Sequence, residues 1–181
     1  MKHDLIDHPA NLSNVLNMLS ANNTETIRNA EKLLKPALKQ PAFLLSLLTQ
    51  MRESPVPEIR QHAALLMKKK LPALFKKLNL THQQQLKSQI LNVMKSENVK
   101  SVSVSVAGCV AMTAKSAFSV GSDWPELFQT VMALSQSPLE AQRCLNYSLL
   151  EQVYDAIHVL TTRSLILSYS STLSFSAYIV V

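Results

Sequence analysis

Apolar residues recur at helical spacing along most of this chain, most clearly over residues 57–71. There, one apolar face repeats every three or four positions, and polar and cationic residues fill the neighbouring face. Pro57 fits the first turn of a helix, and Pro72 is expected to end it, because proline has no backbone N–H to donate. The predicted buried face comprises Ile59, Ala63, Leu66, Met67 and Leu71, and the predicted partner-facing stripe comprises Arg60, Gln61, Ala64, Lys68 and Lys69.

The same periodicity predicts further amphipathic helices on both sides of this segment. A first helix is expected over residues 5–19, and a second from Thr24, which Pro36 should kink or end. Residues 72–80 are read as a lysine-rich connector, followed by a capping box at Thr81 and Gln84. The other predicted starts are Pro41 at a first helical turn, Asp123 as an N-cap and Ser137 as an N-cap.

Residues 99–118 fit two patterns. Serine and valine alternate over residues 101–106, which is typical of a half-buried strand. The segment is long, however, no second strand is available for pairing, and a helical face is also present. A helix is therefore predicted, with Val99, Val102, Val106, Val110 and Thr113 on its apolar face.

The helix pairs are evenly spaced along the chain. They begin near Leu5, Pro41, Thr81 and Asp123, so their starts are 36, 40 and 42 residues apart. This period is typical of HEAT-type arrays, in which each helical hairpin buries its apolar face by stacking on its neighbours. The predicted fold is an all-α solenoid of about four hairpins over residues 4–158, with the first helix of each pair convex and the second concave. The expected repeats are 4–40, 41–72, 81–118 and 123–158, followed by a divergent, irregular tail at 159–181.

Composition supports a packed helical domain with a local positive field. The chain has 181 residues, two glycines and a formal net charge of +6. Between Arg28 and Lys100 there are 14 Lys or Arg residues against four acids, so this segment alone carries a net charge of +10. Such a patch attracts anionic partners. A basic helical scaffold that binds nucleic acid or an anionic membrane through residues 68–77 is therefore the alternative function.

The residue pattern contains no catalytic constellation. There is no phosphate-binding loop, no zinc-ligand spacing and no glycine-flanked nucleophile. Cys109 and Cys144 lie in apolar contexts and are expected to be buried thiols of an intracellular protein. We therefore expect no enzymatic activity, no catalytic residues, no cofactor and no bound metal.

Four short motifs resemble the N-terminal domain of importin-β family transport receptors. Residues 59–69 resemble a segment of that domain that contains an arginine, paired alanines, a leucine and a lysine. In its detailed sequence this segment is most similar to the importin-4 branch. The resemblance covers roughly residues 5–158. The other motifs occur in the expected order: Asn29-Ala30-Glu31 with Leu34, Val106-Ala107-Gly108, and Trp124-Pro125-Glu126-Leu127.

The resemblance implies a nuclear import receptor that moves between cytoplasm and nucleus through the nuclear pore. GTP-bound Ran is the implied partner of the concave helices, while cargo and nucleoporins would bind repeats that this chain lacks, so a truncated form is expected. No obligatory nucleic-acid partner is implied. Carried over by position, the Ran-docking surface consists of Arg60, Gln61, Ala64, Lys68 and Lys69, together with Ser101 and Ser105 on the next concave helix.

The last residues depart from this family pattern. Residues 164–181 carry no charge, which raises the question of a membrane anchor, but six serines among them argue against one. We expect this tail to lie against the open face of the fourth repeat.

Overall fold

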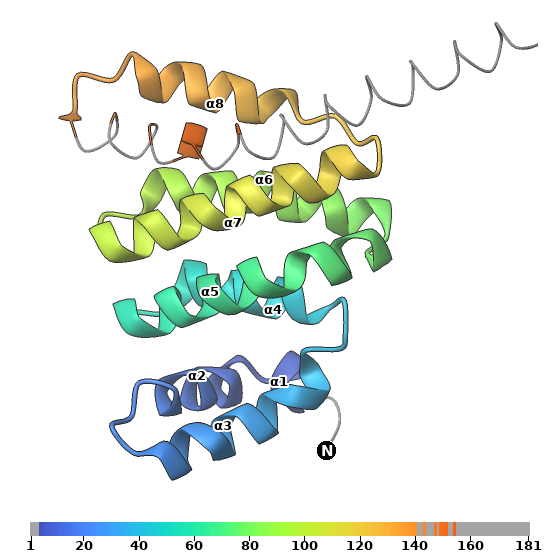
Figure 1. Ribbon diagram of the computed structural model, residues 1–181, viewed down its shortest axis with the longest axis vertical. Coiled ribbons are helices and arrows are strands. Elements are labelled where there is room, and N and C mark those ends of the chain that lie inside the picture. Colours follow the sequence, from blue (N-terminus) through green and yellow to red (C-terminus); the bar gives the residue numbers. More distant parts are fainter. Residues whose placement is uncertain (1–3, 141–142, 144–146, 148, 152–153, 155–181) are drawn as a thin grey trace, which may run out of the picture.

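The computed structural model describes residues 4–140, 143, 147, 149–151 and 154, and every regular element among them is helical (Figure 1). The predicted all-α fold class is confirmed. In chain order the elements are α1 (Asp4–Asp7), α2 (Pro9–Met18), α3 (Thr24–Ala37), α4 (Phe43–Glu53), α5 (Pro57–Leu74), the 3-10 turn η1 (Phe75–Lys77), α6 (Leu80–Ser96), α7 (Lys100–Ser119) and α8 (Pro125–Ser135).

Consecutive helices form hairpins that stack on one another. The hairpins are α2 with α3, α4 with α5, and α6 with α7; α4 also packs on α2 and α6, and α8 packs on α6. In Figure 1 the hairpins follow one another along the long axis, with α5 and α7 in front of α4 and α6. The α-solenoid is therefore confirmed, since each hairpin buries its apolar face against its neighbours.

Hydrogen bonds between neighbouring hairpins join residues that are about one repeat apart in the sequence. Within the described ranges, side-chain hydrogen bonds that join distant parts of the chain span 35 to 45 positions. One example is Gln50, which donates from Nε2 to the carbonyl oxygen of Pro9 at 2.8 Å. Residues one repeat apart in sequence are therefore neighbours in space.

Helix α7 packs between two other helices of the described stack. The prediction of a helix over residues 99–118 is confirmed, because α7 packs against α5 on one side and α6 on the other. By length and composition alone α7 could cross a membrane, but 67% of its apolar stretch is buried inside the fold. Its apolar character is accounted for by this burial.

Two proline predictions were wrong and two were confirmed, one of which is Pro57 at the first turn of α5. Pro72 does not end α5, which continues to Leu74; Leu71 and Leu74 are buried, and this packing outweighs the hydrogen bond lost at proline. Pro41 does not open α4, which begins at Phe43. Pro36 behaves as predicted, since α3 ends at the next residue.

Three helix starts also differ from prediction. The first predicted helix is two helices, because His8 precedes Pro9 and adopts an extended backbone conformation. Helix α6 begins at Leu80, with the Asn79 side chain accepting from the His82 N–H at 2.8 Å, so the predicted capping box at Thr81 and Gln84 is wrong. Asp123 is not the N-cap of α8, because that position belongs to Trp124.

Several predictions fall outside the described residues. These are the environment of Cys144, most of the second helix of the fourth repeat and the whole tail at 159–181.

Candidate functional site

The seven predicted Ran-docking residues lie on α5 and α7, two helices that pack directly against each other. Only part of this set is accessible to a partner, because α5 is also covered by α4. Lys69 and Ser101 are exposed, Arg60, Gln61, Lys68 and Ser105 are partly buried, and Ala64 is fully buried.

Ala64 contributes to the packing between α5 and α7. Its carbonyl oxygen accepts a hydrogen bond from the Cys109 thiol, with the sulfur 2.8 Å away. Burial raises the pKa of the Cys109 thiol to about 12, so this group stays protonated at neutral pH. Ala64, which was predicted to lie on the partner-facing stripe, is buried, and the predicted burial of Cys109 is confirmed.

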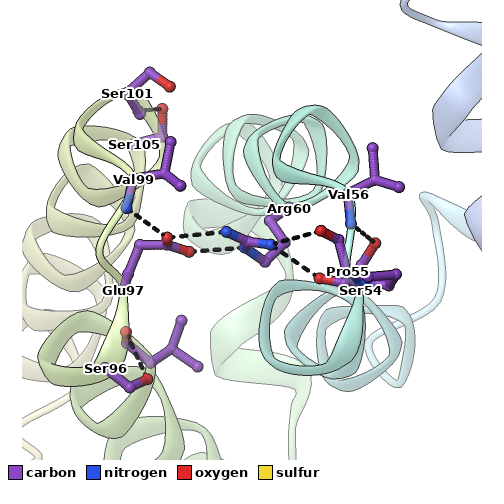
Figure 2. Close-up of polar contacts among 10 residues, drawn as sticks. Ser54, Pro55, Val56, Arg60, Ser96, Glu97, Val99, Ser101 and Ser105 are labelled. Atoms are coloured by element: carbon purple, nitrogen blue, oxygen red, sulfur yellow. Dashed lines mark hydrogen bonds and ion pairs between the residues drawn. The ribbon is translucent and has the colours of Figure 1, made fainter.

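Arg60 is held by groups of the protein itself (Figure 2). Its Nε donates to Glu97 Oε2 at 2.8 Å, and its second terminal nitrogen donates to Glu97 Oε1 at 3.0 Å. Its other terminal nitrogen donates to the carbonyl oxygens of Ser54, at 3.0 Å, and Pro55, at 3.4 Å. The two charged side chains are only 13% and 4% exposed, so Arg60 joins one hairpin to the next.

Glu97 also organises the start of α7. Its Oε1 accepts from the backbone N–H of Val99 at 2.9 Å, which satisfies a donor next to the helix N-terminus. One carboxylate therefore fixes the first residues of α7 and the guanidinium of α5 at the same time. Sequence reasoning missed Glu97, although its separation of 37 residues from Arg60 is close to one repeat.

The environment of Glu97 predicts a pH-dependent stability. Burial raises the pKa of this carboxyl, but hydrogen bonds from Arg60 and the Val99 N–H, with the Arg60 charge, outweigh burial and hold the pKa below its usual 4.5. The ionised form is therefore favoured in the folded state, so its stabilisation is present above pH 4.5 and is lost as the pH falls through the folded-state pKa.

This pH dependence is measurable by urea denaturation of the chain and of the Glu97→Gln variant, from about pH 3 to pH 7. The difference in unfolding free energy between the two proteins should be largest near neutral pH and should shrink on acidification. A difference that stays constant over this range would show that the charge on Glu97 does not contribute.

Arg143 repeats part of the Arg60 arrangement. One of its terminal nitrogens donates to the carbonyl oxygens of Ser137, at 2.8 Å, and Pro138, at 2.9 Å. These acceptors precede Arg143 by six and five residues, as Ser54 and Pro55 precede Arg60. A Ser-Pro pair followed by this arginine is therefore a recurring device at the start of a second repeat helix.

The remaining predicted residues lie along α5 and near the start of α7. Ser105 donates from its hydroxyl to the carbonyl oxygen of Ser101 at 3.0 Å, within α7 (Figure 2). In the described part of the chain, no group of three or more His, Cys, Asp or Glu side chains is placed to hold a metal ion. The polar groups of this surface are hydroxyls, an amide and ammonium groups.

The middle of the chain matches a known family. Residues 30–96 match the family model described as Importin-beta N-terminal domain, from within α3 to the last residue of α6. This stretch is similar to an importin-β N-terminal domain, and the predicted family resemblance is confirmed there.

The chain is also similar in sequence to two longer relatives, over more residues than the family model matches. The chain is 36% identical over 99 residues to Importin-4 of Mus musculus, covering 55% of this chain and 9% of that protein. It is 33% identical over 121 residues to Importin-4 of Homo sapiens, covering 66% of this chain and 11% of that protein. The chain therefore spans about a tenth of the length of these relatives.

Solved structures share the fold of this importin-β N-terminal domain. The crystal structure of Kap121p bound to RanGTP has a TM-score of 0.73 at 19% identity, covering 82% of this chain and 14% of that one. The crystal structure of Kap121p bound to Ste12p has a TM-score of 0.69 at 21% identity, covering 83% and 15%. At these identities the likeness concerns the fold.

Proposed function

We propose that this chain is the Ran-GTP-binding N-terminal portion of a nuclear import receptor. The observation that carries the proposal is the importin-β N-terminal domain at residues 30–96, which contains all of α5. The likeness in fold to Kap121p, whose structure is solved with RanGTP, supports the same partner. The chain would then act between cytoplasm and nucleus, at the nuclear pore.

The proposed Ran surface consists of the accessible residues of α5 and α7. Gln61, Lys68 and Lys69 present an amide and two ammonium groups, and Ser101 and Ser105 add hydroxyls from the neighbouring helix. Arg60 and Ala64 serve this surface indirectly: the Arg60–Glu97 pair and the Ala64–Cys109 contact hold α5 and α7 together. Exposed ion pairs contribute about 0–1 kcal/mol each, so several contacts must act together.

The proposal also assigns the binding partners of a complete receptor to different repeats. We assign residues 4–40, 41–72, 81–118 and 123–158 to four repeats. Import cargo and nucleoporins are assigned to repeats outside this chain, since the chain spans about a tenth of its importin-4 relatives. No membrane contact or obligatory nucleic acid is part of the proposed function.

A pull-down tests Ran binding. The purified chain should retain Ran loaded with GTP and not Ran loaded with GDP, and the double variant Lys68→Glu, Lys69→Glu should lower retention by about fivefold or more, because two attractive charges become repulsive. The matched control Lys76→Glu, Lys77→Glu changes the net charge equally, on η1, and should retain Ran normally.

Two outcomes would contradict the proposal. Equal retention of both nucleotide states, or no retention of either, would remove Ran-GTP as the partner. If the chain instead retained single-stranded RNA, with affinity falling steeply as salt rises, the basic-scaffold alternative would replace it.

A further inference from the structure

The first two repeats leave a groove between α3 and α5. Helix α5 packs closely on α4 and α7, whereas the first hairpin meets the second chiefly through α2, which packs on α4 and α5. The space between α3 and α5 is a groove of about 580 Å³. At its edge, Ser20 Oγ lies 3.4 Å from Nδ1 of His62, which links the α2–α3 turn to α5.

The floor of the groove is apolar and its rims are basic. Leucines line it from both helices and from the start of the α2–α3 turn, and Leu34 is almost fully buried beneath them. Four lysines and one glutamate stand around this floor, which gives the lining a net charge of +3 with His62 neutral. The apolar lining residues are Leu19, Leu34, Leu38 and Leu66, and the lysines are Lys35, Lys39, Lys69 and Lys70.

The four lysines are not used by the fold itself. Within the described ranges, the side-chain ion pairs join Arg52 to Glu53 and Arg60 to Glu97, and none involves a lysine of the groove. Lys35, Lys39 and Lys69 are exposed, and Lys70 is partly exposed. Their ammonium groups are therefore available to carboxylates of a partner.

We infer that the α3–α5 groove binds an acidic amphipathic segment of a partner protein. Apolar side chains of that segment would cover the leucine floor, while its carboxylates would meet lysines from both rims. A helix laid into a groove between two helices is a recurrent mode of peptide recognition, and its apolar anchors lie on one face. This site goes beyond the proposed Ran surface on α5 and α7, with which it shares Lys69 alone.

A protein segment fits the groove better than a nucleic acid. Single strands are held by aromatic stacking as well as by cations, and the lining contains no Phe, Tyr or Trp. A leucine floor also offers a phosphate backbone no favourable contact. The leucine floor and lysine rims of the groove are complementary to a partner segment that presents both apolar side chains and carboxylates.

Fluorescence anisotropy with a synthetic peptide tests this inference. The probe is a fluorescein-labelled helical peptide of leucine and glutamate, with leucines on one face, added to the full chain. It should bind, and the variant Lys35→Glu, Lys39→Glu should weaken binding about tenfold, while Lys76→Glu, Lys77→Glu should change it less than about threefold. All substituted lysines are exposed, so both proteins should fold.

Two further probes distinguish the groove from general charge attraction. A peptide with glutamine in place of leucine, at the same charge, should bind at least about tenfold more weakly, because it lacks apolar anchors. A single-stranded oligonucleotide of equal charge should show no difference between the two lysine variants.

Any of four results would overturn the inference. These are the absence of peptide binding, an equal loss in both lysine variants, equal binding of the glutamine peptide, or oligonucleotide binding that is lost selectively on Lys35→Glu, Lys39→Glu. Ran is absent from every arm, so the outcome is independent of the pull-down.

Discussion

Replacing Trp124 by alanine is expected to destabilise the chain by about 3–5 kcal/mol. Trp124 is 1% exposed and is one of the largest fully buried side chains. It occupies the N-cap position of α8 and lines the same pocket as Lys87 and Leu91 of α6, at the junction between these two helices. Its removal would leave a cavity that the flanking helices cannot close without moving.

The damage from Trp124→Ala should be local. In a repeat array each hairpin contacts its neighbours alone, so loss of one junction frees the elements beyond it. Hydrogen exchange should show that α8 loses protection while α4 and α5 keep theirs. Met132→Ala, at a site on α8 that is 59% exposed, is the control and should cost less than about 0.5 kcal/mol. Uniform loss of protection would argue against this picture.

Glu97→Ala is expected to cost about 3 kcal/mol, because it leaves the partly buried Arg60 guanidinium without its carboxylate. It also removes the acceptor for the Val99 N–H at the start of α7. Urea denaturation at neutral pH measures this loss, and weakened Ran retention should accompany it if the contact between α5 and α7 shapes the docking surface.

The double variant Arg60→Met, Glu97→Leu is the matched comparison for Glu97→Ala. Replacing both charges by apolar side chains removes the unpaired ion, so the double variant should be more stable than Glu97→Ala alone. If both variants were equally unstable, the lost backbone acceptor rather than the stranded charge would explain the effect.

Helix type and order were predictable because apolar periodicity reflects burial directly. Residues 99–118 show this well: the serine–valine alternation suggested a strand, but length and the lack of a partner strand favoured the helix that is observed. Helix ends were less predictable, since several residues compete for each cap. Asn79 offers its side chain two residues before Thr81, and the packing of Leu74 carries α5 past Pro72.

The candidate surface was predictable in place but not in detail. Sequence reasoning selected α5 and the start of α7, yet it assumed one buried face for α5. Because both α4 and α7 cover α5, Ala64 is buried and Arg60 is engaged with Glu97. The groove between α3 and α5 was not predicted, since helical periodicity does not report how far two helices stand apart.

The Arg60–Glu97 pair limits where the chain can be truncated without leaving Arg60 unpaired. The family match ends at residue 96, one position before Glu97. A fragment that ends at residue 96 would contain the whole of α5, with the guanidinium of Arg60. It would lack the carboxylate of Glu97 and helix α7, which follows it. A stable fragment should therefore extend beyond the domain boundary, because the α4–α5 hairpin requires Glu97, in the turn of the next hairpin, to neutralise Arg60.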